Sequence, residues 1–272
     1  MAGERWQIGL DIQPHGWYAL AVVPRRRGWQ VKGCWQQALP GEDVPGGGLP
    51  ATAPLVASLC RWRQALPRRY SLRLALPAER VLQRTLPAPD AQLRAPYRET
   101  FLLNQAAKQF PLAREALALD YRSPSSQPQQ VVVTAAPQVD VAAWLEVMAA
   151  AGLAVEVLEI APCALQASAR LAGLPAGHVV VHRFWHGWLW ATPRSHPFQF
   201  GVAAVDTPWE TLLPAALHGA PVALSSVLDE APPGVQAWSP LATLPDTILP
   251  IGTPAAAFVL AVGLAVRPED CP

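Results

Sequence analysis

The stretch from Val131 to Pro162 constrains the fold of this 272-residue chain more than any other. It opens with a β-branched run, Val131–Thr134, which is typical of a strand. After Pro137, apolar residues recur at the spacing of one helix face, at Val141, Trp144, Leu145 and Met148. Pro137 suits the first turn of such a helix, where a missing backbone N–H costs nothing.

The same stretch ends with the signals of a second strand. Gly152 suits the left-handed position that follows a helix, and Val155–Ile160 is another apolar run before Pro162. A strand, a helix and a strand within about 30 residues are typical of a βαβ unit in a parallel sheet. The sequence therefore predicts an α/β fold, with this unit as part of its scaffold.

The other predicted elements are short, and many of the chain's 30 prolines separate them. Strands are expected at Trp6–Ile12, Trp17–Val23, Trp29–Gln37, Ser71–Leu76, Val81–Thr85, Ala116–Tyr121, Val179–Val181, Trp188–Ala191 and near Val222 and Ile248. Helices are expected at Ala53–Ala65, Pro96–Gln109, Cys163–Leu171, Thr207–Leu217 and Pro254–Val266, with loops at 39–54 and 123–130. The first three strands are predicted to form an antiparallel meander, and the last helix to be buried on most sides.

The net charge of +1 gives the whole chain no general attraction to nucleic acid or to a membrane surface. Basic residues do cluster locally, at Arg25–Arg27, at Arg61 with Arg63, and at Arg68 with Arg69. We interpret these clusters as solvated charges, with contact to anionic lipid headgroups as the alternative.

The cysteines and the hydropathy pattern indicate a reducing compartment and no membrane span. Cys34, Cys60, Cys163 and Cys271 are far apart and form no C-x-x-C pair, which disfavours a structural zinc site. The longest apolar run, Ala255–Val266, is shorter than the roughly 20 residues that cross a bilayer. No signal-peptide pattern is evident at the N-terminus, so a cytosolic protein is expected.

The two halves of the chain begin alike, with a strand, a tight turn and a strand, as actin-like and sugar-kinase-like folds do. Five segments, in their order, resemble the PilM family of actin-like proteins of type IV pilus assembly, above all its short enterobacterial members, which are associated with uptake or use of external DNA. These segments are Ile8–Ile12, Leu74–Pro77 with Leu82–Pro87, Phe110–Leu112 with Ala116–Tyr121, Val131–Pro162 and Ala257–Val266. The resemblance covers most of residues 6–175 and the C-terminal helix.

The resemblance implies an actin-like (ribonuclease H-like) two-domain α/β fold. The first domain would span residues 1–172, with a small inserted subdomain at about 77–121, and a shortened second domain would span 173–272. It also implies binding of ATP, and of the short N-terminal cytoplasmic tail of a PilN-like (HofN-like) inner-membrane protein. In the family this tail lies in a groove between the first subdomain and its insert. The chain would then be cytoplasmic and peripheral to the inner membrane through its partner.

The two turns that hold phosphates in actin-like folds lack their usual residues in this chain. Such turns need glycine, so that backbone N–H groups can approach phosphate oxygens. In the first turn Asp11 is kept, but Gln13 replaces the family's glycine, and Pro14 and His15 replace its serines. Pro14 has no backbone N–H to donate. Asp11 alone does not make a Mg²⁺–phosphate site.

The second turn departs from the family pattern in the same way. It should begin with an acid and a glycine, but these positions hold His182 and Phe184, followed by the bulky Trp185. The glycine-rich adenosine segment is also missing, and residues 219–226 are the nearest candidate. We therefore predict that this chain holds no nucleotide, with ATP and Mg²⁺ in a diverged site as the alternative.

Other chemistries find weaker support. His178, His182 and His186 are spaced by four, which favours a metal site, but a predicted hairpin turn separates His186 from the other two. Ser225 and Ser226 lack the G-x-S-x-G elbow of a nucleophile, and Cys163 has no defined base. We expect no metal site and no catalytic residue.

The predicted helix at Pro96–Gln109 carries the candidate partner site. One mixed face holds Tyr97, Phe101, Asn104, Gln105 and Lys108. Apolar anchors ringed by amides and a cation fit an extended peptide whose backbone must be hydrogen-bonded. The alternative is that Phe101, with Leu102, packs the insert against its own strands.

These observations favour a nucleotide-free actin-like scaffold that recognises a partner peptide. The first rival is an active ATPase of the same fold. The second rival is direct DNA handling, for which the only basic and aromatic cluster is Arg61, Trp62, Arg63, Arg68, Arg69 and Tyr70. The net charge argues against this second rival.

Overall fold

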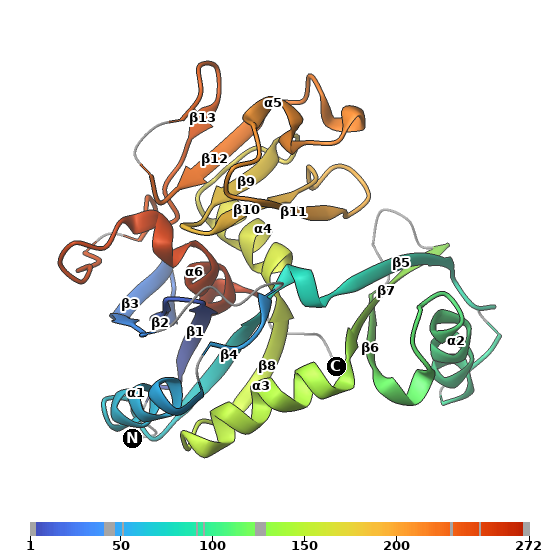
Figure 1. The fold of residues 1–272 in the computed structure, drawn as a ribbon, viewed down its shortest axis with the longest axis horizontal. Helices are drawn as coiled ribbons and strands as arrows, with labels where there is room; N and C mark the ends of the chain where they lie inside the picture. Colours follow the sequence, from blue (N-terminus) through green and yellow to red (C-terminus); the bar gives the residue numbers. More distant parts are fainter. Residues whose placement is uncertain are drawn as a thin grey trace. The chain divides into compact units, whose positions relative to one another are not determined.

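The computed structural model describes residues 4–40, 47–50, 52–90, 92–94, 96–122, 129–228, 231–244 and 246–268. The chain forms two compact units (Figure 1). Residues 1–78 and 148–272 make the first unit, and residues 79–147 make the second. Most of the loop expected at 123–130, part of the loop at 39–54, and Cys271 lie outside the described residues.

The first unit begins with a five-stranded sheet in the order β3-β2-β1-β4-β8. Its strands are β1 (Trp6–Gln13), β2 (Gly16–Arg25), β3 (Gly28–Ala38), β4 (Tyr70–Leu76) and β8 (Val155–Ile160). The first three strands are antiparallel, so the predicted N-terminal meander is confirmed, and β4 and β8 add in parallel to β1. Helix α1 (Thr52–Gln64) connects β3 to β4, close to its predicted bounds.

A second five-stranded sheet in the same unit has the order β11-β10-β9-β12-β13. Its strands are β9 (Val179–Arg183), β10 (Gly187–Ala191), β11 (Phe200–Ala204), β12 (Val222–Ser226) and β13 (Gln236–Ala237). Three antiparallel strands again come first, and two parallel strands follow. The two sheets therefore repeat one topology, as expected from the similar openings of the two halves.

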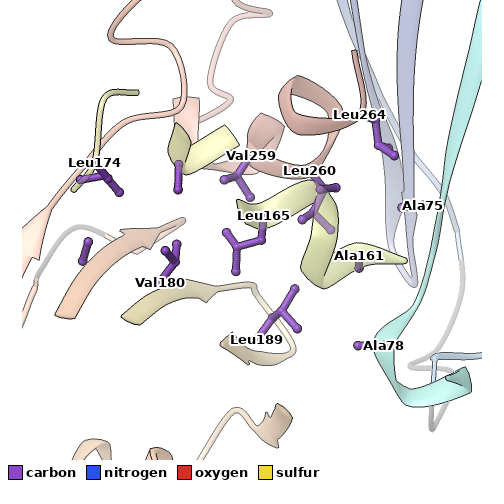
Figure 2. Packing of buried hydrophobic residues seen from close by; sticks show 13 residues of the cluster. Ala75, Ala78, Ala161, Leu165, Leu174, Val180, Leu189, Val259, Leu260 and Leu264 are labelled. Atoms are coloured by element: carbon purple, nitrogen blue, oxygen red, sulfur yellow. The ribbon is translucent and has the colours of Figure 1, made fainter. Parts of the chain in front are cut away.

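Helices α4 (Ala161–Leu171) and α6 (Val259–Val266) lie between the two sheets of the first unit (Figure 1). Their buried side chains meet in one cluster, in which Leu165 of α4 contacts apolar residues of α6 and of β9 and β10 (Figure 2). The predicted apolar C-terminal helix is confirmed, because seven of the eight residues of α6, all but Val266, are buried. A short 3₁₀ turn, Ala255–Phe258, leads into α6.

Two glycines allow the close approach of α6 to its neighbours. A Cβ on Gly9 of β1 would lie 2.0 Å from the carbonyl oxygen of Ala261, and one on Gly263 would lie 1.8 Å from the carbonyl oxygen of Ala164. Real side chains never come this close to backbone, so any larger residue would push α6 away from β1 or α4. Gly9 is the glycine of the segment Ile8–Ile12 that carries part of the PilM resemblance.

The second unit is a three-stranded antiparallel sheet in the order β5-β7-β6, with one helix packed on it. Its elements are β5 (Leu82–Pro87), α2 (Tyr97–Ala107), β6 (Leu117–Arg122), β7 (Gln130–Pro137) and most of α3 (Gln138–Ala150), with 3₁₀ turns at Ala78–Arg80 and Arg114–Ala116. Leu102 and Ala106 of α2 pack on Val131, Val133 and Ala135 of β7.

The prediction of a βαβ unit at 131–162 is wrong in its pairing. Strand, helix and strand all form where expected, but β7 and β8 belong to different sheets. β7 is the central strand of the antiparallel sheet, whereas β8 pairs in parallel with β4. A β-branched run identifies a strand but not its neighbours, because pairing depends on residues far away in the sequence.

The helix ends follow local sequence signals. Gly152 has φ of +70°, and the N–H groups of Gly152 and Leu153 donate to the carbonyls of Ala149 and Met148. Gly173, with φ of +78°, ends α4 in the same way. Its N–H donates to the carbonyl of Arg170, and the N–H of Leu174 donates to the carbonyl of Ala169. Both are Schellman ends, which satisfy carbonyl groups that the helix leaves without partners.

Two other predictions are wrong, one between β11 and β12 and one between β13 and α6. The helix expected at Thr207–Leu217 is two short pieces, α5 (Trp209–Leu212) and a 3₁₀ turn (Ala215–Leu217), because Pro214 interrupts it. The strand expected near Ile248 is irregular chain, and this side chain is exposed. The domain division at 172/173 and the insert bounds of 77–121 stay predictions.

Candidate functional site

In the first hairpin turn, side chains of β1 are hydrogen-bonded to each other. Gln13 pairs with Gly16 across the turn, which leaves Pro14 and His15 at its tip, neither with a positive φ. Asp11 and Gln13 lie on the same side of β1, two residues apart, and both are buried. The amide nitrogen of Gln13 donates a hydrogen bond of 2.8 Å to the Asp11 carboxylate. The one acid kept from the family pattern is therefore bound by the residue that replaces the glycine.

The second hairpin turn is filled by aromatic rings. The edge of His182 meets the Phe184 ring at 4.3 Å between centroids, and Phe184 stacks on His186 at 5.2 Å. The N–H of Phe184 donates to the carbonyl of Gly187 and closes the hairpin. These rings occupy the position at which a glycine turn would offer its N–H groups to a phosphate.

His182, at the position of the family's acid, is held in its neutral form. Its side chain is fully buried, and its Nδ1 donates to the carbonyl oxygen of Ser225 at 3.1 Å. Burial is the main cause that lowers the pKa of His182 to about 3, and His186 lowers it further, while the bond to Ser225 acts in the opposite direction. A neutral imidazole in this place carries no charge that would hold a magnesium ion or a phosphate.

Trp185 of the second turn lies close enough to Tyr18, beside the first turn, to affect the pKa of its hydroxyl. Trp185 follows Phe184 at the tip of the second turn, and Tyr18 lies in β2 just after the first turn, packed edge-on against Phe258. Burial raises the pKa of the Tyr18 hydroxyl, the hydrogen bond with Trp185 lowers it, and the charge of Asp11 raises it. Side chains from the two turns therefore lie next to each other in this chain.

The three histidines do not form a metal site. His178 precedes β9 and His182 is buried four residues further along this strand, while His186 lies in the turn after β9, with the Phe184 ring packed against both His182 and His186. Within the described ranges, no group of three His, Cys, Asp or Glu side chains is arranged to hold a metal ion.

The three candidate nucleophiles, Ser225, Ser226 and Cys163, are buried, half-buried or hydrogen-bonded within the chain. Ser225 is fully buried, and the Ser226 hydroxyl accepts a bond of 3.0 Å from the N–H of Leu228. Cys163 is half-buried in the first turn of α4.

The five predicted partner-binding residues share one exposed face of α2. Tyr97 is 74% exposed and Phe101 48% exposed, and Asn104, Gln105 and Lys108 are exposed beside them. The opposite face holds Leu102 and Ala106, which are buried on the sheet. Phe101 therefore does not serve as core of this unit, whereas Leu102 does. The face combines two exposed rings, two amides and one cation, a set that can grip apolar side chains and also bond a peptide backbone.

The basic and aromatic cluster considered for DNA uses its aromatic rings internally. Trp62 is buried, with ring centroids 5.1 Å from Trp17 and 5.9 Å from Trp35. The guanidinium of Arg63 lies 5.1 Å from the centroid of Tyr70. No ring of this cluster is left as a stacking platform for nucleic-acid bases.

Sequence reasoning missed Arg73, which fixes α6 to the first sheet. Arg73 is buried in β4, and its Nη1 donates to the carbonyls of Leu264, Ala265 and Arg267 at 2.9–3.1 Å. Arg267 also forms a buried ion pair of 3.1 Å with Glu159 of β8. Cations at the end of a helix complement its dipole and its unbonded carbonyls. An arginine inside the apolar run of β4 was the signal for such a role.

Comparisons with known proteins agree with this fold. No family model matches the chain. The solved "PilM-PilN type IV pilus biogenesis complex" has a chain of the same fold, with a TM-score of 0.69, 18% identity, and coverage of 98% of this chain and 100% of that one. The cytoplasmic domain of EpsL, an inner membrane component of the type II secretion system of Vibrio cholerae, aligns with a TM-score of 0.56 and 13% identity, over 96% and 95% of the two chains. This chain is therefore a protein of the actin-like α/β fold class, as expected.

Within that class the chain is similar to a particular curated protein. It is 29% identical to the "DNA utilization protein HofM" of Escherichia coli (strain K12) over 267 residues, 98% of each chain. The resemblance to PilM-type proteins, and to their short enterobacterial members, is confirmed. No helix in the described part of the chain is both long and apolar enough to cross a membrane.

Proposed function

We propose that this protein is a nucleotide-free, actin-like scaffold of a type IV pilus or DNA-uptake assembly at the inner membrane. It works in the cytoplasm, is not an enzyme, and binds the N-terminal cytoplasmic tail of a PilN-like (HofN-like) membrane protein through α2. The full-length similarity to HofM and the shared fold of the PilM–PilN complex support the type of assembly. Neither comparison identifies the residues that bind a partner.

The exposed face of α2 is the observation that carries the partner proposal. A helix packed on a sheet needs only its buried stripe, here Leu102 and Ala106, to stay in place. Tyr97 and Phe101 instead leave much of their rings in contact with water, which disfavours exposed apolar surface by about 25 cal/mol per Å². A partner that covers both rings recovers this free energy.

The polar residues of the face suit an extended peptide. Asn104 and Gln105 each offer a donor and an acceptor, and Lys108, at the C-cap of α2, adds a cation at the negative end of the helix dipole. A tail that leaves water must satisfy its own N–H and C=O groups, and amide side chains can do this without a fixed register. The rings would then supply affinity, and the amides would supply orientation.

The rival function is that of a diverged ATPase that binds ATP–Mg between its two sheets. The retained Asp11 favours this rival, because such an acid faces the metal in actin-like enzymes. Against it, the Gln13 amide already binds Asp11. A nucleotide would have to break this bond and would find no glycine turn in exchange.

Fluorescence polarisation with a labelled tail peptide tests the proposal. The double substitution Asn104→Ala with Lys108→Ala should leave the melting temperature nearly unchanged, because both side chains are exposed. It should weaken tail binding by several-fold, on the order of 1–2 kcal/mol.

The matched control is Gln37→Ala with Arg170→Ala, which removes one exposed amide and one exposed cation from the first unit. This control should bind the tail like the wild type. Equal affinity for the α2 variant and the wild type would move the site away from α2. No binding by the wild type at micromolar concentrations would remove the proposal.

A further inference from the structure

Six arginines gather at one end of the first sheet, the end opposite the first hairpin turn. We call this group the arginine rim: Arg5, Arg25, Arg26, Arg27, Arg68 and Arg69, all exposed. Arg25 ends β2 and pairs with Gly28 at the β2–β3 turn, and Arg5 immediately precedes β1. Arg69 precedes β4, and its carbonyl accepts a bond from the N–H of Trp6.

The pairing of the strands keeps the rim compact. β2, β1 and β4 are adjacent in the sheet, and neighbouring strands are about 4.8 Å apart, so the ends of β2 and β4 lie on the order of 10 Å from each other. This distance is close to the Debye length at physiological ionic strength, about 8 Å, so the charges act on a partner together.

Acidic neighbours neutralise only part of the rim. Glu4 forms ion pairs with Arg25 at 2.5 Å and with Lys32 at 3.1 Å, and Arg5 pairs with Glu156. The side chains of Arg26, Arg27, Arg68 and Arg69 make no ion pair or hydrogen bond with any residue in the described ranges. Since the whole chain has a net charge of only +1, the chain outside this end is net acidic. The charge is therefore concentrated at one end and not spread over the surface.

We propose that the arginine rim docks on the anionic phospholipid headgroups of a membrane. The inference rests on the proposed function, which brings the chain to the inner membrane through a partner's tail. Guanidinium groups bind phosphate oxygens through paired N–H donors, and clustered basic residues near an anionic bilayer add their attractions. The rim would fix which end of the first unit faces the bilayer.

Nucleic acid is the other polyanion that a basic rim could bind, and the aromatic residues disfavour it. Trp62 is buried against Trp17 and Trp35, and Arg63 covers Tyr70. Single strands are held by rings on which bases stack, and the rings beside the rim pack within the chain, Trp6 on Trp35 and Trp29 on an apolar cluster of the first unit. A lipid headgroup needs only the charge and the donors.

Co-sedimentation of the full chain with vesicles tests the proposal. The probes are vesicles of phosphatidylcholine alone, and vesicles of phosphatidylcholine with about 30% phosphatidylglycerol. The wild type should bind only the anionic vesicles, and 0.5 M salt should release it. Arg27→Glu with Arg68→Glu should weaken this binding at least about tenfold, because each basic residue near such a surface contributes roughly fivefold.

The matched control reverses the same number of charges elsewhere, at the exposed Arg94 and Arg170. Arg94→Glu with Arg170→Glu should bind anionic vesicles within about threefold of the wild type. Equal weakening in both variants would mean that only net charge matters, and would overturn the assignment to the rim. No wild-type binding to anionic vesicles would also overturn it, as would tighter binding to a DNA duplex than to vesicles at equal salt.

The tail-binding assay separates this proposal from the proposed function. Arg27→Glu with Arg68→Glu should bind the labelled tail peptide like the wild type, whereas Asn104→Ala with Lys108→Ala should bind anionic vesicles like the wild type. Loss of tail binding with vesicle binding intact would reject the partner proposal alone. Loss of vesicle binding in the α2 variant would reject the rim.

Discussion

The two hairpin turns and the exposed face of α2 use the same kinds of residues in opposite ways. In the turns, side chains are bonded within the chain: the Gln13 amide to Asp11 and the His182 ring to the carbonyl of Ser225, while Trp185 lies beside Tyr18. On α2, the rings and amides face solvent. The turns have few free donors for a ligand, while the helix face has many.

The difference at the two hairpin turns concerns nucleotide binding and leaves the fold itself unchanged. The first unit keeps the repeated sheet topology and the packed central helices of the actin-like class. What differs from the family pattern is the residues of the two turns, where Gln13 and Phe184 stand at the glycine positions. The proposed scaffold would keep this fold without a nucleotide, because a fold does not determine a function.

The largest effect should come from acidification, through His182. An unfolded histidine takes up a proton as the pH falls below about 6.5, but the buried His182 stays neutral down to its pKa of about 3. The unfolded state therefore binds more protons between these values, and stability falls as the pH falls. The expected loss is about 3 kcal/mol from pH 6.5 to pH 4.

Denaturant unfolding at several pH values, on the wild type and on His182→Gln, would measure this loss. The variant should show a clearly shallower decline over the same range, because glutamine does not titrate. Identical pH profiles for the two proteins would mean that His182 is protonated in the folded state.

A second, smaller effect is expected at the first turn. Gln13→Leu should destabilise the protein by about 2 kcal/mol, because it removes a charge-assisted bond to the buried Asp11 and supplies no other donor. The matched change on α2, Gln105→Leu, alters an exposed amide and should cost less than about 0.5 kcal/mol. Urea unfolding of both variants measures these losses in the free energy of unfolding. Equal losses would contradict the difference between the bonded side chains of the turns and the exposed face of α2.

The exposed rings of α2 should matter for binding and not for folding. Tyr97→Ala is expected to weaken tail binding by about tenfold, since truncated aromatic anchors commonly cost more than 1 kcal/mol. Leu102→Ala, on the buried face, should instead lower the melting temperature. Polarisation and thermal scans on both variants would show whether the two faces of one helix separate in this way. A tail affinity unchanged by Tyr97→Ala would restrict the site to the polar residues.

The smallest expected effect concerns metal. Protein as purified should contain no stoichiometric zinc, because His178 and His182 are four residues apart on a strand and the Phe184 ring packs against both His182 and His186. Elemental analysis measures this directly, and a chelator should leave the melting temperature unchanged. One zinc per chain, lost on His182→Ala, would contradict the structural role of this residue.

Local patterns predicted the elements of the fold well, but not their pairing. The N-terminal meander, the glycine end of α3 and the apolar α6 follow from spacing and turn chemistry that act within a few residues. The sheet membership of β7 does not, because Val131–Thr134 could pair with any apolar strand. Pairing between distant segments depends on the whole chain, so a run of β-branched residues does not predict which strand it pairs with.

The candidate site shows the same division. The exposed face of α2 follows from helical periodicity, so its five residues were predictable from the sequence. The bond from Gln13 to Asp11 could also have been found, because residues two apart on a strand share a face. The contact of Trp185 with Tyr18 joins residues far apart in the chain, and no local pattern indicates it.

A titration of the labelled tail peptide, with and without Mg-ATP, tests the central claim most directly. The wild type is expected to bind the tail with the same affinity in both conditions, and a parallel calorimetric titration should show no saturable heat from Mg-ATP. Binding that requires Mg-ATP, or micromolar affinity for the nucleotide itself, would contradict a scaffold whose phosphate turns are filled by its own side chains.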